Sequence, residues 1–164
     1  KIEGGTATAN ITKELVNRGM PVMAHVGLTP QSAHALGGYH VQGKSLPEAQ
    51  EIVNGAQAQA NAGAFAIVLE MLPAKLAGAI TKHVPIPTIG IGAGVHCDGQ
   101  IQVLHDLLGL SSSGFRHSRV FAEIASISEA ALREYAQQVR SADFPSLEQS
   151  FKGRRGTVNR LTFE

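Results

Sequence analysis

Short apolar segments alternate with longer amphipathic segments along most of this 164-residue chain. The clearest apolar segment is AFAIVLE, residues 64–70, in which six apolar residues lead to the carboxylate of Glu70. A continuous apolar run of this length is typical of a strand that is buried on both faces, as the strands of parallel sheets are. Regular alternation of such strands with helices predicts an α/β fold with a parallel sheet and right-handed crossovers.

The remaining elements follow from the same patterns. Strands are predicted at 1–3, 22–26 and 88–91, and helices at 6–18, 45–62, 73–83 and 126–140. Two capping boxes, Ser45 with Glu48 and Ser126 with Glu129, predict where two of these helices begin. Residues 99–108 fit a strand or a helix. The Gly-, Pro- and Ser-rich stretch 27–44 is long for a connection, which predicts a functional loop.

The ends of the predicted strands favour a barrel over an open sheet. Each strand ends in a polar or glycine-rich motif, and a barrel places one ring of loops at the carboxyl ends of its strands. Only four or five strands can be recognised, whereas a closed (β/α)8 barrel takes at least about 200 residues. We therefore expect the later part of a (β/α)8 TIM barrel over residues 1–145, followed by a C-terminal tail over residues 146–164.

Charge and cysteine content argue against several classes of protein. The formal net charge is +1, without the concentrated basic excess of nucleic-acid-binding proteins. No apolar run reaches about 18 residues and no signal pattern opens the chain, so no membrane partner is expected. The only cysteine, Cys97, allows no disulfide framework and favours a reducing, intracellular compartment. The cytoplasm is favoured, with the mitochondrion as the alternative for a eukaryotic source.

Ionisable residues at the ends of predicted strands form the candidate site. In a barrel, Lys1, Glu3 and Glu70 would meet at one rim. Two carboxylates and a lysine suit a hard cation such as Mg²⁺ and proton abstraction beside a carbonyl. For two residues a non-functional interpretation is also open. Glu70 could simply leave the strand into solvent, and His25, near the end of the second strand, could be a packing residue or a functional one.

Other motifs argue against dinucleotide binding, a zinc protease site and nucleophilic catalysis. The sequence GIGAG at 90–94 lacks the third glycine of a dinucleotide-binding fingerprint, because residue 95 is Val95. It could let the backbone approach a ligand closely, or it could be a tight turn without a ligand. The seven histidines show no H-x-x-x-H pattern, so a zinc protease is not supported. Cys97 has no base placed beside it in the sequence, which argues against nucleophilic catalysis.

Several motifs taken together resemble one known family. They are KIEGG, HVGLTPQS, GGYHVQGK, VLEMLP and IPTIGIGAGVHCDGQIQVLHDLLGL, and in this order they resemble the ketopantoate hydroxymethyltransferases. The resemblance is strong over residues 1–110, weaker over 128–144, and covers about the last two-thirds of a family member. It implies a barrel of the phosphoenolpyruvate mutase and isocitrate lyase type and a homo-oligomer, usually a decamer.

The resemblance also implies an activity and a role for each candidate residue. The family uses Mg²⁺ and moves a hydroxymethyl group from methylene-tetrahydrofolate to 3-methyl-2-oxobutanoate, giving ketopantoate for pantothenate biosynthesis. By resemblance, Lys1 binds the substrate carboxylate, Glu3 belongs to the metal site, and Glu70 is the general base that takes the proton beside the carbonyl. We place His25 with Lys1 among the substrate-binding residues.

The chain also departs from the family pattern. The first strands of the family, with two aspartates that bind the metal, have no counterpart here, so we expect them from the same or another polypeptide. The segment RHSRVFA, residues 116–122, differs from the usual Pro-Arg/Lys-Phe-Val-Lys pattern. Two alternatives to the transferase remain open. One is a non-catalytic barrel fragment or assembly partner, and the other is a carbon–carbon lyase of the same superfamily.

Overall fold

The computed structural model describes residues 1–35, 37–111, 114–153 and 162. Its sheet has five strands in the order in which they occur along the chain, and every neighbouring pair is parallel. The strands are β1 (Ile2–Glu3), β2 (Met23–Gly27), β3 (Ala66–Glu70), β4 (Thr88–Ile91) and β5 (Gly99–Gln100). This confirms the predicted α/β class and parallel sheet. The sequential strand order is the one that a partial TIM-barrel-like fold requires.

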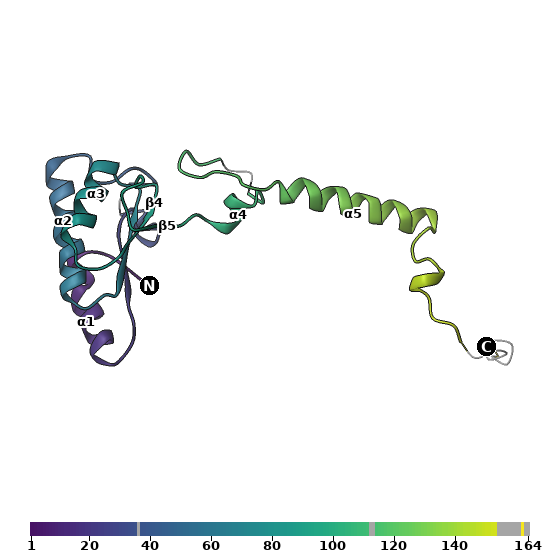
Figure 1. The fold of residues 1–164 in the computed structure, drawn as a ribbon, viewed down its shortest axis with the longest axis horizontal. Coiled ribbons are helices and arrows are strands. Elements are labelled where there is room, and N and C mark those ends of the chain that lie inside the picture. Colours follow the sequence, from purple (N-terminus) through teal and green to yellow (C-terminus); the bar gives the residue numbers. More distant parts are fainter. Residues whose placement is uncertain (36, 112–113, 154–161, 163–164) are drawn as a thin grey trace.

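Three helices connect the first four strands: α1 (Ala9–Asn17), α2 (Leu46–Asn61) and α3 (Ala74–His83). Each crossover advances by one strand in the same direction, so right-handed connections place all three helices on one side of the sheet (Figure 1). The core between helices and sheet consists of small and branched apolar side chains, including Ala24, Val26, Ala56, Ile67, Leu69, Ala77 and Ile80.

The alternation of side chains along the strands divides the sheet into two faces. In β2 and β3 the helix-facing positions hold Ala24, Val26, Ile67 and Leu69. Because successive side chains point to opposite faces, His25 and Glu70 project from the face that is turned away from the helices. That face would be the interior of a closed barrel.

The first predicted capping box is confirmed. Ser45 is the N-cap of α2, and its hydroxyl oxygen accepts the Glu48 N–H at 3.4 Å. The Glu48 carboxylate in turn accepts the N–H of Ser45 at 3.4 Å. The two bonds satisfy donors that the first turn of a helix cannot satisfy itself. Helix α2 begins at the position that this motif predicted.

The second predicted capping box is wrong. Helix α5 (Ile124–Ser141) begins before Ser126, whose hydroxyl donates to the carbonyl of Glu123 instead of capping the helix. The reason lies in the preceding short helix α4 (Leu104–Leu107) and the residue after it. Their last carbonyls accept N–H groups from the chain just before and at the start of α5, Phe121 to Leu107 and Ile124 to Leu108. These contacts fix the chain and start the helix early.

The structure defines two stretches whose secondary structure the sequence did not specify. Residues 99–108 contain both predicted alternatives, because β5 is followed by α4. In the long connection 27–44, Gly27 ends β2, and the other described residues form only a short 3-10 turn at Pro30–Ser32. It therefore remains the long loop over the carboxyl end of β2 that the sequence predicted.

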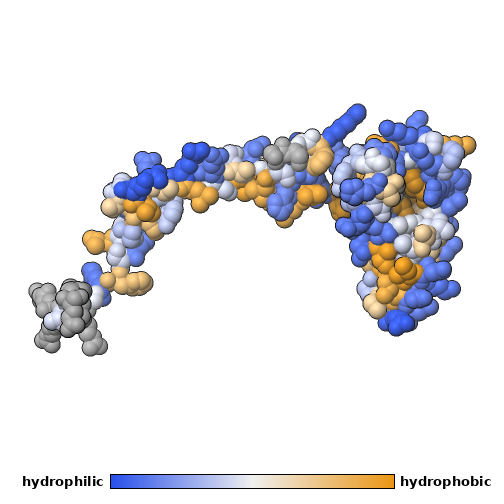
Figure 2. Space-filling model, turned by 180° about the vertical axis from the view of Figure 1, so that it is seen from behind, coloured by the Kyte–Doolittle hydropathy of each residue, from blue (hydrophilic) through white to orange (hydrophobic). Residues whose placement is uncertain are grey.

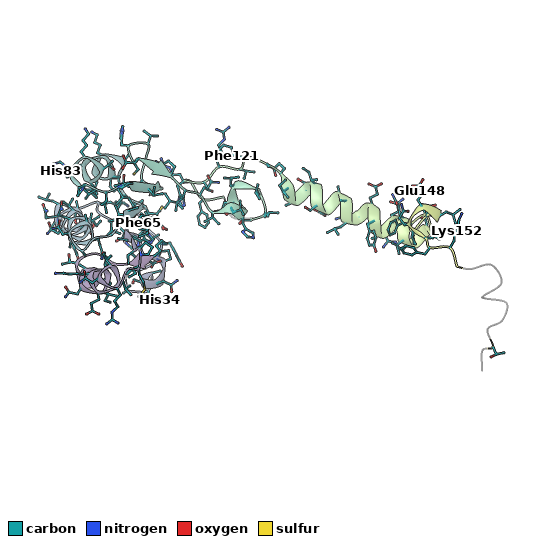
Figure 3. All side chains as sticks on the ribbon, turned by 60° about the horizontal axis from the view of Figure 1, so that its bottom comes forward. His34, Phe65, His83, Phe121, Glu148 and Lys152 are labelled. Atoms are coloured by element: carbon teal, nitrogen blue, oxygen red, sulfur yellow. The ribbon has the colours of Figure 1, made fainter. Side chains whose placement is uncertain are left out.

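Helix α5 extends away from the α/β body as an arm (Figure 1). None of its residues is buried, and apolar side chains line the arm (Figure 2). Phe121 lies where the body meets the arm, and Glu148 and Lys152 lie near its far end (Figure 3). Part of the predicted tail, 154–161 and 163–164, lies outside the described residues. No described helix combines the length and apolarity needed to cross a membrane.

A buried polar network joins α1 and α2 to the turn that follows β1. Gln59 and Thr12 are both fully buried, and the Thr12 hydroxyl donates to the Gln59 side-chain oxygen at 2.7 Å. The Gln59 amide nitrogen donates to the carbonyls of Gly4 at 3.1 Å and Gly5 at 2.8 Å. The network therefore fixes the chain immediately after Glu3.

Replacing Gln59 by Leu is expected to destabilise the protein by about 2–4 kcal/mol. The substitution removes the partners of the buried Thr12 hydroxyl and of the partly buried Gly4 carbonyl, and each unsatisfied group costs about 1–3 kcal/mol. The matched control is Gln50→Leu on the same helix, where only an exposed bond to Asn54 is lost. Urea unfolding of both variants measures the difference. Equal midpoints would show that the network does not stabilise the turn.

Candidate functional site

The sheet register brings the four sequence-predicted residues together. Glu3 pairs with His25 across β1 and β2, and Gly27 pairs with Glu70 across β2 and β3. Neighbouring residues of parallel strands share a face, so all the side chains meet at the carboxyl end of the sheet, away from the helices. Lys1, just before β1, reaches the same place, with its Nζ 2.8 Å from His25 Nδ1.

His25 lies at the centre of this group. Its side chain is fully buried, with Nδ1 3.7 Å from Glu3 Oε1 and Nε2 3.1 Å from Glu70 Oε2. The distance from Nε2 to the Glu70 carboxylate is short enough for a hydrogen bond, but the geometry is not that of a hydrogen bond. Nε2 therefore has no hydrogen-bond partner. Catalytic hydrogen bonds are often poorly aligned before substrate binds. At 3.1 Å, His25 Nε2 therefore lies within reach of the Glu70 carboxylate.

Glu3 is held on two sides. One carboxylate oxygen accepts the N–H of Gln31 at 2.9 Å, and the other lies 4.0 Å from Lys1 Nζ. Gln31 belongs to the long loop 27–44, so this loop contacts the site through its backbone. Sequence reasoning did not identify Gln31, because a main-chain donor leaves no side-chain signature.

The described residues contain no group of three side chains arranged to hold a metal ion. Mg²⁺ is commonly bound through one or two carboxylates, with water and substrate oxygens completing its shell. The partly exposed carboxylate of Glu3 fits the role of one such ligand. The remaining ligands would have to come from water, substrate or other polypeptide segments.

The backbone around Glu70 is fixed by three hydrogen bonds, two with the long loop 27–44 and one with the end of β4. The Glu70 carbonyl accepts the N–H of Leu28 at 2.9 Å, and the next residue, Met71, donates to the carbonyl of Ile91 at 2.9 Å. The Met71 carbonyl accepts the N–H of Gln42, also at 2.9 Å. Met71 has a φ of 51°, which is costly for a residue with a side chain and is typical of functional sites. These contacts hold the Glu70 carboxylate at the strand end.

The divergent segment 116–122 also approaches this end of the sheet. A Cβ placed on Gly92 would lie 3.0 Å from the Met71 sulfur and 3.2 Å from the His117 ring. His117 therefore packs at the exit of β4, where Phe115 stacks on its ring with centroids 5.5 Å apart. Glycine at 92 permits this close approach. The sequence showed only that the segment departs from the family pattern, without indicating this contact.

A cavity of about 310 Å³ lies beside the site, near the ends of β1 and β2. Its walls include the glycine turn after Glu3, the loop residue Gln42 and the first turns of α2, where Glu48 and Glu51 lie. None of Lys1, Glu3, His25 or Glu70 lines it. The cavity therefore neighbours the candidate site and is not its centre.

Cys97 and Asp98 form a separate polar cluster at the start of β4. Burial raises the pKa of the Cys97 thiol, which favours the unreactive protonated form. Hydrogen bonds from the N–H and hydroxyl of Thr88, at 2.8 and 3.0 Å, lower the pKa of the Asp98 carboxyl. A protonated thiol agrees with the expectation that Cys97 is not a nucleophile.

Comparison with known proteins gives consistent results. The sequence profile of a family described as ketopantoate hydroxymethyltransferase matches residues 1–147. Proteins named 3-methyl-2-oxobutanoate hydroxymethyltransferase are 51% identical over 152 residues in Carboxydothermus hydrogenoformans and 52% identical over 154 residues in Moorella thermoacetica. These matches cover 92% and 93% of the chain but 55% and 57% of the relatives. The chain thus spans little more than half their length, less than the two-thirds expected from its motifs.

Proposed function

The chain belongs to the ketopantoate hydroxymethyltransferase family, and from this premise we propose that it carries the proton-abstracting half of a hydroxymethyltransferase site. The reaction transfers the methylene carbon of methylene-tetrahydrofolate to C3 of 3-methyl-2-oxobutanoate, with water supplying the hydroxyl of the new hydroxymethyl group and tetrahydrofolate leaving, in pantothenate biosynthesis. The observation that carries the proposal is the continuous contact from Lys1 through His25 to Glu70, with Glu3 beside it. In this proposal Glu70 is the base, Lys1 is the cation and Glu3 is a second carboxylate, all near the carboxyl ends of neighbouring strands.

Each residue has a role that its surroundings support. Glu70 accepts the C3 proton, and its side chain is 17% exposed, enough to reach a substrate at the end of the sheet. The Lys1 ammonium, 44% exposed, pairs with the carboxylate of the keto acid. Because Lys1 and Glu70 contact opposite nitrogens of His25, they would engage the two ends of a short keto acid.

We propose Mg²⁺ as the cofactor, with Glu3 as the carboxylate of this chain that would hold it. Bound Mg²⁺ supplies stabilisation of the negative charge that develops on the keto oxygen during proton removal. Gln31 would keep the Glu3 carboxylate in place through its N–H. Methylene-tetrahydrofolate would supply the one-carbon unit to the carbon from which Glu70 has removed the proton.

We also propose that further barrel strands from the same or another polypeptide complete the site. Two edges of the sheet, at β1 and β5, are unpaired among the described strands. The apolar residues of α5 are exposed, Ile127 by 63% and Leu132 by 67%, and unpaired edges and apolar helix faces favour association. A barrel of the phosphoenolpyruvate mutase and isocitrate lyase type would cover both. This proposal is preferred to a non-catalytic fragment because the acid–base residues are assembled.

A fusion protein tests the proposed function. The part of the Carboxydothermus hydrogenoformans relative that its alignment with this chain leaves uncovered would be joined to residues 1–164. In D₂O with Mg²⁺, we expect the methyl doublet of 3-methyl-2-oxobutanoate to collapse to a singlet as deuterium replaces the C3 proton. Added methylene-tetrahydrofolate should then give ketopantoate. A fusion that melts cooperatively but leaves the C3 proton in place would overturn the proposal.

A further inference from the structure

The His25 ring is enclosed by charged groups from three directions. Lys1 Nζ lies 2.8 Å from Nδ1 and Glu70 Oε2 lies 3.1 Å from Nε2. Glu3 Oε1 is 3.7 Å from Nδ1, on the Lys1 side of the ring. Nε2 is the one fully buried side-chain nitrogen or oxygen in the described part of the chain that lacks a well-aligned partner. A buried polar atom in that condition calls for a functional explanation.

The contact with Lys1 determines which ring nitrogen carries the proton. An ammonium group can only donate hydrogen bonds, so Nδ1 must accept one from Lys1. A neutral imidazole with its acceptor at Nδ1 carries its proton on Nε2. The Nε2–H group then faces the Glu70 carboxylate. In the opposite tautomer, an N–H would face the ammonium and a lone pair would face the carboxylate, and both contacts would be repulsive.

We propose that His25 is a positioning residue that orients the Glu70 carboxylate, and that Lys1 selects the tautomer in which it can do so. The proposal rests on Glu70 being the base of the proposed function. One oxygen of Glu70, Oε2, is engaged by Nε2–H, which leaves the other oxygen to accept the substrate proton. The proposal gives His25 an action on the base in place of the role in substrate binding that the sequence suggested.

The imperfect alignment of the His25–Glu70 contact fits this role. The Nε2–Oε2 distance is already 3.1 Å, so the hydrogen bond needs a change of angle and no closer approach of the two strands. The main chain of Glu70 is held by Leu28, and that of Met71 by Ile91 and Gln42, so the side-chain torsions are what remain adjustable. His25 is fully buried on an interior strand of the sheet. Its Nε2–H group is therefore a donor of fixed position, and the Glu70 carboxylate rotates to accept from it.

Nitrogen NMR of the 164-residue chain, labelled with ¹⁵N-histidine, reads the tautomer directly. For His25 we expect Nδ1 to resonate as an unprotonated nitrogen and Nε2 as a protonated one, with signals assigned by their loss in His25→Asn. Lys1→Met should shift the proton at least in part to Nδ1. The matched control, Lys44→Met, removes an exposed lysine elsewhere and should change nothing. A proton on Nδ1 in the unmodified chain, or no change in Lys1→Met, would overturn the proposal.

Kinetics of the fusion protein separate positioning from substrate binding. The amide of glutamine can replace Nε2–H of histidine, whereas the shorter asparagine replaces only the Nδ1 side. His25→Asn should lower kcat by about 100-fold at nearly unchanged KM, the scale of a misplaced catalytic group, and His25→Gln should restore much of it. A raised KM with unchanged kcat in both variants would return His25 to substrate binding. If the unmodified fusion removes no proton, the proposed function fails, while the NMR result still decides the tautomer.

Discussion

Replacing Glu70 by Gln in the fusion protein is expected to lower the rate of C3 proton exchange by at least about 10³-fold, within the range of loss for general-base catalysis. Glutamine has nearly the same size as glutamate and its carbonyl oxygen can still accept from His25 Nε2–H. It cannot accept a proton from a carbon acid. The change therefore removes the base and keeps the geometry of the site.

The measurement is the initial rate of methyl-doublet collapse in D₂O at saturating 3-methyl-2-oxobutanoate. Glu14→Gln is the matched control, because Glu14 is an exposed carboxylate on α1 and its loss should leave the rate unchanged. Affinity for the keto acid should change little in either variant. If Glu70→Gln retains more than about a tenth of the original rate, a different group is the base, because general-base catalysis contributes at least about 100-fold.

The fold was largely predictable because its pattern is local. Buried strands such as 64–70 carry their own apolar signature, and the capping box at Ser45 is complete within four residues. The same motif failed at Ser126, because carbonyls at the end of α4 fix the chain before the helix. A sequence pattern cannot reveal such a contact, since the partners are brought together by the path of the chain.

The candidate site was predictable in part, for a related reason. The positions of Lys1, Glu3 and Glu70 at strand ends were sufficient to predict that they meet. His25 was predicted as a site residue, but its contacts with Glu3 and Glu70 were not, because they depend on the register that pairs it with Glu3 and places Gly27 beside Glu70.

Gln59, on helix α2, is a second residue whose contacts could not be predicted from the sequence pattern. The segment AQAQAN of α2, residues 56–61, offers several polar residues, and the packing of Gly55 against Gly5 turns Gln59 inward. Its bonds to the carbonyls of Gly4 and Gly5 depend on that packing. The sequence pattern therefore left open which of these glutamines is buried.

The glycine at position 27 links the stability of the sheet to the position of Glu70, and Gly27→Ala is expected to destabilise the protein by about 3 kcal/mol or more. Gly27 has a φ of +94°, and a Cβ there would overlap the Glu70 carbonyl oxygen and lie 2.9 Å from Leu72 Cδ2. Left-handed backbone costs alanine about 1–2 kcal/mol, and overpacking adds about 1–3 kcal/mol.

The variant Gly19→Ala separates the cost of the left-handed backbone from the cost of overpacking. Gly19 also has a positive φ, +82°, but a Cβ there would meet nothing within 4 Å, so only the backbone cost of about 1–2 kcal/mol should appear. Urea unfolding of the two variants should therefore differ by the overpacking energy. Since the overlap is with Glu70 itself, relief requires β2 and β3 to shift apart and moves the carboxylate from His25. In the fusion protein, Gly27→Ala should slow C3 proton exchange while Gly19→Ala does not. Equal unfolding midpoints and equal exchange rates for the two variants would show that the strand ends accommodate the Cβ at position 27 without displacing Glu70.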